Sequence, residues 1–397
     1  PSFSFAWVTS DEPFFKDRIS WLYLKERISW GKNGNQGIGR YSSLSKMGIT
    51  NYVYDSSSTV AIYPSTLGNS SLKWESTASL NFGLDWGLFN RRISGSFDFY
   101  TAKTSDLLIQ RSIPTTTGYS SVWSNLGQIA NKGFEIELVS KNLTGILDWE
   151  TNFTFAMNKD KIVDLYGDKT TNDIGNSWFI GEPISAIYDY EMVDGTVWSE
   201  ADLFSGNILD GWYPGQFKLV DQNNDGQIEA KTDRKIVGYE DHLFRFSINN
   251  TFAYKNFALS FFINSIQGGK EHYLYENSYF LLMPVVGTGD PYRRNQFAIR
   301  QYWKPDNGVT NAVGMYNNPP RTAGLYQSRS FVRLQDVSIS YTFDEKLLKK
   351  LKLSSCQVYV SSKNPYIWTK WGGWDPEITL RSMSSMRNIT LGLKVTL

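Results

Sequence analysis

Segments of about ten residues in which apolar and polar side chains alternate recur along this chain. In an extended strand successive side chains point to opposite faces, so each such segment has one apolar and one polar face. In residues 78–86, for example, Leu80, Phe82 and Leu84 share one face, while Asn81 and Asp85 share the other. About eleven such segments are found, centred near residues 5, 27, 80, 97, 136, 153, 248, 262, 337, 360 and 393. The pattern predicts an all-β protein.

The connections between these segments distinguish a membrane barrel from a soluble β-sandwich, whose strands alternate in the same way. Short connections near residues 90, 145, 255 and 348 alternate with long excursions over about 35–73, 105–130, 159–241 and 269–327. Outer-membrane barrels have short periplasmic turns and long extracellular loops. A tilted strand of about ten residues also spans their apolar band of about 25 Å. We therefore expect part of a large antiparallel transmembrane β-barrel.

Aromatic content agrees with a barrel. Phe, Tyr and Trp make up 15% of the chain, yet the mean hydropathy is −0.36. A barrel reconciles these values, because its apolar residues alternate with polar ones and its rings form girdles at the membrane interfaces. The longest apolar stretch, near residues 280–286, is about seven residues long and includes Pro284, whereas a spanning helix needs roughly 20. No transmembrane helix is predicted.

Several classes of protein are disfavoured by what the sequence contains. The single cysteine, Cys356, allows neither an internal disulfide framework nor a cysteine metal cluster. A net charge of +1 does not indicate the strongly basic composition that is typical of nucleic-acid-binding proteins. The two histidines, His242 and His272, have no carboxylate or nucleophile at a catalytic spacing, and no GxSxG, P-loop or HExxH motif is found. We do not expect an enzyme, and no catalytic residue is assigned.

One motif has the spacing of a metal site. Asp221, Asn223, Asp225 and Gly226 stand as D-x-N-x-D-G, the first half of an EF-hand-like calcium loop. The second half deviates, because position twelve is Thr232 and the next carboxylate, on Asp233, is one residue late. The two interpretations are a Ca²⁺ site and a polar turn rich in Asp, Asn and Gly. The ligands of the calcium loop would be Asp221, Asn223, Asp225, Gln227, Glu229 and Asp233.

Aromatic residues of the longest excursion are candidates for substrate binding. Sugar faces stack on exposed rings, and this excursion contains Trp178, Trp198, Trp212 and Tyr213. The alternative is that these rings pack the loop against its neighbours or against a partner. Charged residues on the polar strand faces, such as Asp85 and Asp98, would line a lumen or contact a plug.

Several stretches carry a resemblance to a known family. They are LKWESTASLNFGLDWGLFNRRISGSFDF (72–99), YTAKTSDLL (100–108), GQIANKGFE (127–135), DQNNDG (221–226), SFVRLQDVSISY (330–341) and VYVSSKNPYIWTKWGGWDPE (358–377). In this order they resemble the C-terminal half of the SusC/RagA-like TonB-dependent outer-membrane transporters. The resemblance runs essentially from end to end of the chain.

The resemblance implies a fold, a location and partners. The fold would be the C-terminal portion, about eleven strands, of a plugged barrel of the 22-stranded type, integral to the bacterial outer membrane and in contact with its lipid. The barrel would import oligosaccharides or peptides with energy supplied through TonB, under a SusD-like surface lipoprotein. The plug domain and the TonB-contacting segment lie outside residues 1–397.

An odd number of strands implies a missing portion. About eleven strands would place the two ends of the chain on opposite sides of the membrane, whereas bacterial single-chain barrels have even numbers. An open sheet would also leave unpaired edges in lipid. We therefore expect the chain to associate with an N-terminal half.

Two other functions compete with import. One is a surface binding or adhesion protein that uses the barrel only as an anchor, and the other is a soluble carbohydrate-binding module. Dependence on detergent separates the module from a barrel, and uptake assays separate adhesion from import.

Overall fold

The fold is described from a computed structural model of the chain. The structure describes residues 1–37, 41–54, 57–119, 121–272, 303–306, 308–309, 319–321, 323–373, 375–378 and 385–396. The chain divides into two compact units, residues 1–184 and residues 185–397. Among the described residues, the units contain eleven long strands, six in the first and five in the second. Each unit is considered separately below.

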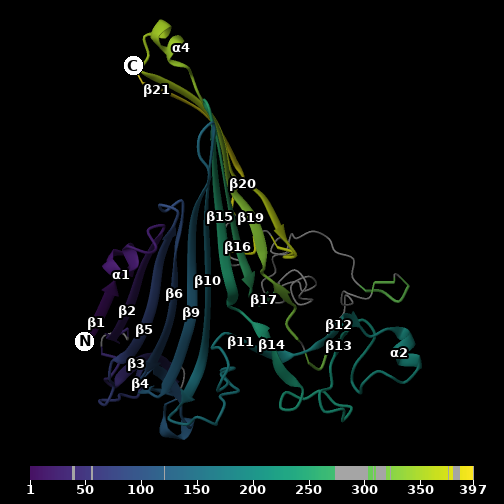
Figure 1. The fold of residues 1–397 in the computed structure, drawn as a ribbon. Coiled ribbons are helices and arrows are strands. Elements are labelled where there is room, and N and C mark those ends of the chain that lie inside the picture. Colours follow the sequence, from purple (N-terminus) through teal and green to yellow (C-terminus); the bar gives the residue numbers. More distant parts are fainter. Residues whose placement is uncertain are drawn as a thin grey trace. The chain divides into compact units, whose positions relative to one another are not determined.

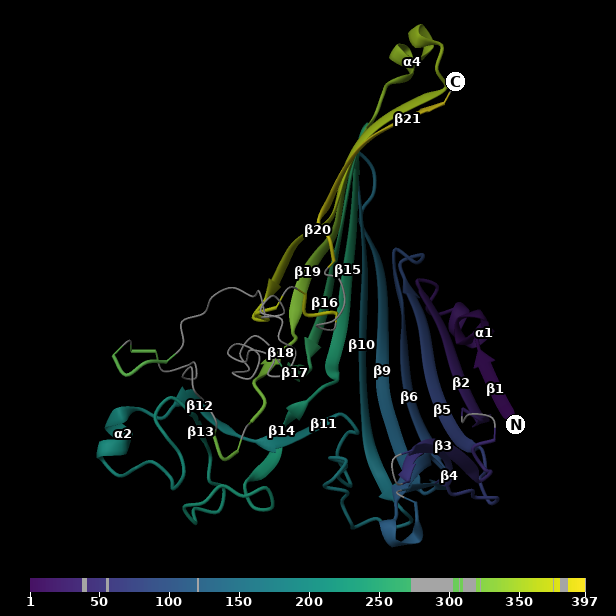
Figure 2. The same ribbon diagram turned by 180° about the vertical axis from the view of Figure 1, so that it is seen from behind.

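The first unit is built on six long strands that lie side by side (Figures 1 and 2). Every neighbouring pair is antiparallel, and the order in space follows the order in sequence. The strands are β1 (Ser2–Trp7), β2 (Leu22–Asn35), β5 (Glu75–Leu88), β6 (Ile93–Ser105), β9 (Gly127–Leu143) and β10 (Leu147–Leu165). Each coincides with an alternating segment of the sequence, so the prediction of these strands is confirmed.

The second unit contains five long antiparallel strands, again in sequence order. They are β15 (His242–Tyr254), β16 (Phe257–Gly268), β19 (Phe331–Thr342), β20 (Ser355–Thr369) and β21 (Asn388–Thr396). They account for the remaining alternating segments. The predicted all-β, antiparallel fold is therefore confirmed in both units.

The register keeps apolar side chains on one face across successive strands. In the first unit, one row of cross-strand partners is Ile28, Phe82, Phe99, Phe134 and Met157. In the second unit, Leu259, Ile339, Val360 and Leu391 form such a row. Much of this surface is open, since Phe82 is 43% and Leu391 75% exposed. An apolar strand face left open in this way is suited to lipid, as expected for a membrane barrel.

Short turns join the long strands at one end. Residues 89–92 join β5 to β6, residues 144–146 join β9 to β10, and residues 255–256 join β15 to β16. Asn90 and Lys255 adopt positive φ values of 56° and 50°, as tight hairpin turns require. Short α4 (Glu345–Leu351) lies within the connection from β19 to β20.

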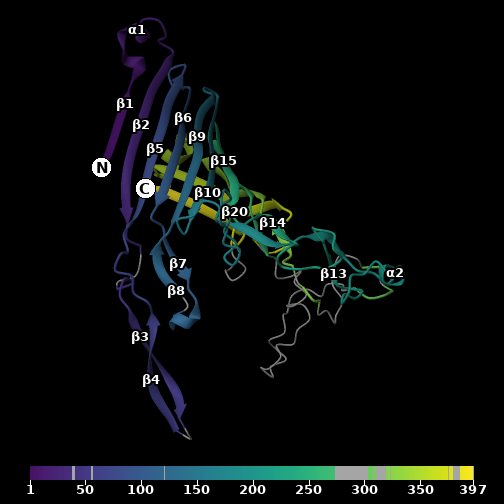
Figure 3. The same ribbon diagram turned by 90° about the horizontal axis from the view of Figure 1, so that it is seen from below.

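The long excursions contain strands of their own, which the alternation did not predict (Figure 3). Each pair forms a small two-stranded sheet. In the first unit the pairs are β3 (Lys46–Tyr54) with β4 (Ser57–Thr66) and β7 (Leu108–Ser112) with β8 (Ser121–Asn125). In the second unit they are β11 (Ala186–Tyr190) with β14 (Arg234–Tyr239), β12 (Met192–Val197) with β13 (Phe217–Leu219), and β17 (Lys270–His272) with β18 (Tyr326–Ser328).

One loop boundary differs from the sequence prediction. The excursion expected from residue 159 begins only after Leu165, because β10 continues to that residue. Residues 159–165 pair with residues 127–132 of β9, part of which had been expected in a loop. This stretch carries several charged residues, so its hydrophobic alternation is weak, and the pairing partner extends the strand.

Helices are short. Besides α4, the described residues contain α1 (Pro13–Lys16), α2 (Glu200–Phe204), η1 (Thr9–Asp11) and η2 (Thr115–Thr117). Over the part of the chain that the structure describes, none of the helices combines the length and hydropathy needed to cross a membrane.

Candidate functional site

An ionic network crosses the polar face of three strands in the first unit. The Arg27 guanidinium on β2 contacts Asp85 on β5, with 2.8 Å between Nη2 and Oδ1, and Asp98 on β6, with 2.9 Å between Nη2 and Oδ2. Gly83 lies between them, and a Cβ added there would be 2.5 Å from Arg27 Cζ. The missing side chain therefore lets the guanidinium lie across the sheet. The sequence indicated Asp85 and Asp98 as charged residues of the polar strand faces. It did not single out Arg27, whose positive charge compensates both carboxylates.

The Asp221 motif forms a tight, internally bonded loop in the second unit. The Asp221 carboxylate accepts backbone hydrogen bonds of 2.7 Å from the N–H of Asn224 and 2.7 Å from that of Gly226. Asn223 donates through Nδ2 to Asp225 Oδ2 at 2.8 Å. Gly226 has a φ of 79°, which glycine adopts without strain. The alternate Asp and Asn residues therefore hold the backbone in its turn.

Asp233 lies under this loop and fixes its two ends. Its carboxylate accepts from the N–H of Gln222 at 2.8 Å and of Glu229 at 2.7 Å, and from the Thr232 hydroxyl at 2.9 Å. The residue is fully buried. Burial opposes ionisation, but the hydrogen bonds from Glu229, Gln222 and Thr232 outweigh it and hold the pKa of Asp233 below its usual value. The carboxylate that is one residue late for an EF-hand thus closes the loop.

The side chains of the remaining candidate ligands do not converge in the structure. Gln227 and Glu229, the other proposed ligands, are both exposed. Gln227 contributes its backbone N–H to Asp225 Oδ1 at 2.8 Å. Among the described residues, no three His, Cys, Asp or Glu side chains are grouped so that they could hold a metal ion. Calcium binding by this loop stays a prediction.

The four aromatic candidates have different surroundings. Trp198 and Trp212 are buried, and with Tyr190, Leu219 and Ile228 they form the core of the 185–240 segment. Trp178, in the first unit, is half-buried. Tyr213 is 64% exposed. The packing interpretation therefore describes Trp198 and Trp212, while Tyr213 has the exposure that ring stacking with a sugar would need.

Cations flank the buried rings of this core. Lys218 Nζ lies 4.9 Å from the Trp198 ring centroid and 2.9 Å from Asp202 Oδ2. Burial raises the pKa of Asp202, but Ser199 and Lys218 outweigh this effect and lower it to about 2. Ser199 and Asp202 also form a capping box at the start of α2. The excursion is thus a folded element with its own core and capped helix.

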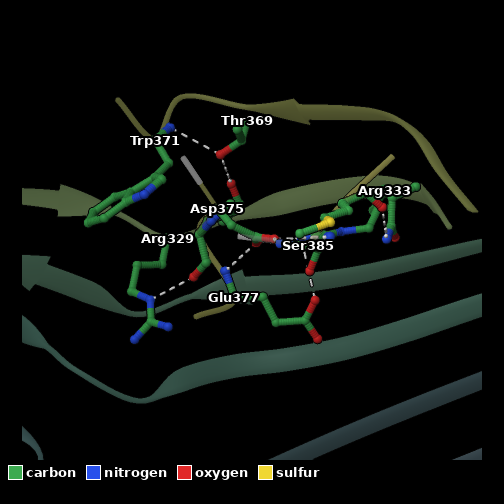
Figure 4. Close-up of polar contacts among 11 residues, drawn as sticks. Arg329, Arg333, Thr369, Trp371, Asp375, Glu377 and Ser385 are labelled. Carbon is green, nitrogen blue, oxygen red and sulfur yellow. Dashed lines mark hydrogen bonds and ion pairs between the residues drawn. The ribbon is translucent and has the colours of Figure 1, made fainter. Parts of the chain in front are cut away.

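A buried ion pair anchors the segment after β20 to the polar face of β19 (Figure 4). Arg333 on β19 binds both carboxylate oxygens of Asp375, with 2.5 Å from Nη2 to Oδ1 and 3.2 Å from Nη1 to Oδ2. The Arg333 side chain is only 4% exposed. Glu377 lies 3.5 Å from the same Nη2 and donates its backbone N–H to Asp375. Bidentate pairing of this kind fixes both distance and orientation.

Neighbouring contacts extend this anchor, which we call the 369–377 strap. The Thr369 hydroxyl donates to the Ser330 carbonyl at 2.8 Å, and Arg329 Nε donates to the Pro376 carbonyl at 2.8 Å. Gly372 donates its N–H to the Gln327 side chain at 3.0 Å. Trp371 is buried, whereas Trp368 is half exposed and lies on the apolar face with Val332. A position in an aromatic girdle at the membrane interface therefore fits Trp368 but not Trp371.

Burial of the strap affects its ionisation. Burial opposes the charge on Asp375, but the hydrogen bonds from Arg333, Glu377 and Ser385 outweigh it and hold its pKa below the usual value. Asp375 is therefore ionised at neutral pH and compensates the buried guanidinium. Arg333 and Asp375 both lie in stretches that carry the family resemblance. They are 42 residues apart, and no spacing pattern in the sequence indicated that they would pair.

Comparisons with known proteins give the same family as the sequence motifs. TonB-dependent receptor P3 of Formosa agariphila is 32% identical over 99% of this chain and 40% of that receptor. TonB-dependent receptor SusC of Bacteroides thetaiotaomicron is 27% identical over 95% of this chain and 37% of that receptor. This chain is a relative of the SusC-type TonB-dependent receptors. It spans about two fifths of the length of these relatives. No protein-family model matches it.

The fold agrees with this relationship. The solved RagAB peptide transporter superposes with a TM-score of 0.75 at 22% identity, over all of this SusC-type chain and 43% of the transporter chain. The protein is accordingly an outer-membrane β-barrel protein. In each unit the apolar strand face is the lipid-facing surface. The Arg27 network lies on the polar face of the first unit, and the strap lies on the polar face of the second.

Proposed function

We propose that the complete protein imports oligosaccharides or peptides across the outer membrane, with energy supplied through TonB. The observation that carries the proposal is the relationship to the TonB-dependent receptors over nearly the whole chain. The names of these relatives state the dependence on TonB, and the solved structure with the same fold is titled a peptide transporter. Which of the two substrate classes is moved is a question for the uptake assay.

The polar strand face supports transport through a filled lumen. Several of its charged groups are paired within the protein, as in the Arg27 network and in the pair between Arg333 and Asp375. The strap lies on this face and buries Trp371 and Pro376. An occupied lumen is consistent with import that must be gated.

We also propose that a SusD-like surface lipoprotein covers the extracellular side. The 185–240 segment has a core of its own and large exposed groups, including Leu203, Phe204 and Tyr213. Folded excursions of this length are usually functional. A specific protein contact would bury upwards of about 1,000 Å².

Uptake by cells tests the import function. Cells that carry the complete gene should take up a labelled oligosaccharide or peptide mixture, and loss of TonB or addition of a protonophore should abolish that uptake. A gene deletion should stop growth on at least one such mixture, and the complementing gene should restore it. The tagged protein should also co-purify with an abundant lipoprotein in mild detergent. Unaltered growth on every mixture together with purification without a lipoprotein would instead support the adhesion function.

A further inference from the structure

Helix α4 has one apolar side that the protein leaves uncovered. At 3.6 residues per turn, Leu347 and Leu351 lie one above the other, with Leu348 beside them. Leu348 is buried against the protein, but Leu347 is 42% and Leu351 57% exposed. Lys346 and Lys350 border the exposed pair on one side of the helix. Apolar side chains bordered by lysines are typical of helices that lie in a membrane interface.

The charge of the helix is mostly uncompensated. Asp344, which precedes the helix, accepts a hydrogen bond of 2.6 Å from Asn256 Nδ2 in the β15–β16 turn. Glu345 pairs with Lys349 at 3.5 Å, and both groups are highly exposed. Within the described part of the chain, no carboxylate forms an ion pair with Lys346, Lys350 or Lys352. Three lysines are therefore available for an anionic partner.

Aromatic rings, of which Phe257 and Tyr254 are exposed, place this surface at the rim of the lipid-facing wall. Phe257 and Tyr341 are cross-strand partners on the apolar face, with ring centroids 4.7 Å apart, and Phe343 packs 5.2 Å from Tyr341. Lys255, in the same turn as Asn256, lies 5.3 Å from the Tyr254 ring centroid. Figure 1 shows α4 beyond the start of β20, far from β17 and from β11 to β14 of this unit. Aromatic rings at such a rim mark the level of the lipid headgroups.

We propose that α4 and the adjacent Lys255–Asn256 turn bind the headgroups of anionic phospholipids at the short-turn rim of the barrel. Short turns of outer-membrane barrels are periplasmic, so the lipid belongs to the inner leaflet. Leu347 and Leu351 enter the boundary between headgroups and acyl chains, and Lys346, Lys350 and Lys352 contact the phosphate groups. The inference rests on the outer-membrane location and is independent of what the protein imports.

The test measures lipid retained by the complete purified protein. Native mass spectrometry in mild detergent, after incubation with equal amounts of phosphatidylglycerol and phosphatidylcholine, should show preferential retention of phosphatidylglycerol. The triple variant K346Q/K350Q/K352Q should lose that preference. Its affinity for phosphatidylglycerol should fall by about fivefold for each lysine replaced. The control K73Q/K169Q/K231Q removes three exposed lysines from the excursions and should behave like the parent. Millimolar inorganic phosphate should not compete, because the apolar side also requires acyl chains.

Two further measurements test the proposal even if the triple variant fails to fold. High salt should reduce the preference of the unmodified protein for phosphatidylglycerol, because the contact is electrostatic. A photoreactive side chain introduced at Leu351 should crosslink to lipid in native membranes. Parent-level preference in K346Q/K350Q/K352Q, or crosslinking at Leu351 to a periplasmic protein instead of lipid, would overturn the proposal. Neither outcome bears on uptake, so its failure is distinct from that of the import function.

Discussion

At the scale of single residues, the buried pair of Arg333 and Asp375 has the greatest consequence for the strap. Two charges removed from water are tolerated only when each compensates the other and the remaining hydrogen-bonding capacity is filled. Asp375 meets this condition with the guanidinium and two backbone N–H groups. Asp233 has a different solution, because neutral donors alone fill the hydrogen-bonding capacity of its buried carboxylate.

Removing the Asp375 carboxylate should release the strap. Asp375→Ala leaves a buried guanidinium uncompensated, which costs about 3–5 kcal/mol. Cleavage by trypsin after the exposed Lys370 tracks the open population, so we expect it to accelerate about 100-fold or more. Glu377→Gln is the control, because Glu377 is half exposed and only 3.5 Å from Arg333, and should change cleavage little. Equal cleavage of the parent and Asp375→Ala would contradict the anchoring role.

The same pair predicts how the strap responds to acid. Because the folded pKa of Asp375 is depressed, its contribution to stability is present above the unfolded value of about 3.9 and is lost as the pH falls through the folded pKa. Protection of Lys370 from an acid-stable protease should therefore persist below pH 3.9. Loss of protection already near pH 5 would show that another group controls the strap.

The calcium prediction is tested at Asp225, whose side chain is exposed. If the loop binds calcium, a concentration 100 times the Kd stabilises the protein by about 2.7 kcal/mol. The Tm should then rise for the parent but not for Asp225→Ala. Asp233→Ala should lower the Tm in either case, since it breaks three hydrogen bonds beneath the loop. If calcium raises the Tm of neither the parent nor Asp225→Ala, the loop is a hydrogen-bonded turn that does not bind calcium.

At the scale of elements, close approach of the strands depends on glycines opposite large rings. Gly133 on β9 faces Tyr100 on β6, Gly95 on β6 faces Trp86 on β5, and Gly392 on β21 pairs with Tyr359 on β20. In each pair the ring lies over the glycine, where an added Cβ would be 3.0 Å or less from it. Such pairs cover the backbone of the glycine and fix the strand register.

Filling one of these positions should strain the sheet. A Cβ at Gly133 would lie 2.4 Å from the Met157 carbonyl oxygen and 2.5 Å from the Tyr100 hydroxyl. Since the carbonyl belongs to the backbone, Gly133→Ala should cost about 1–3 kcal/mol, measured as a lower Tm in detergent. The matched control is Gly31→Ala in β2, where the nearest atom is 3.6 Å away. Tyr100→Phe should relieve the strain only in part, and full relief would show that the backbone clash is unimportant.

At the scale of the whole molecule, each unit shows the same division between an apolar and a polar strand face. The apolar face is open and the polar face carries paired charges and, in the second unit, the strap. The division explains why the chain is aromatic and yet hydrophilic on average.

The sequence by itself determined the long strands, their faces and the family. Alternation with a period of two is a local property that can be read from the sequence without knowledge of tertiary contacts, and it located the eleven long strands of the two units. It did not reveal the small sheets of the excursions, the extension of β10 or the burial of Trp198 and Trp212. Those features depend on which distant segments meet. Only the tertiary structure brought Arg333 to Asp375, Arg27 to Asp98 and Asp233 beneath the Asp221 loop, because hydrogen bonds and ion pairs act over a few ångströms between residues that the chain sets far apart.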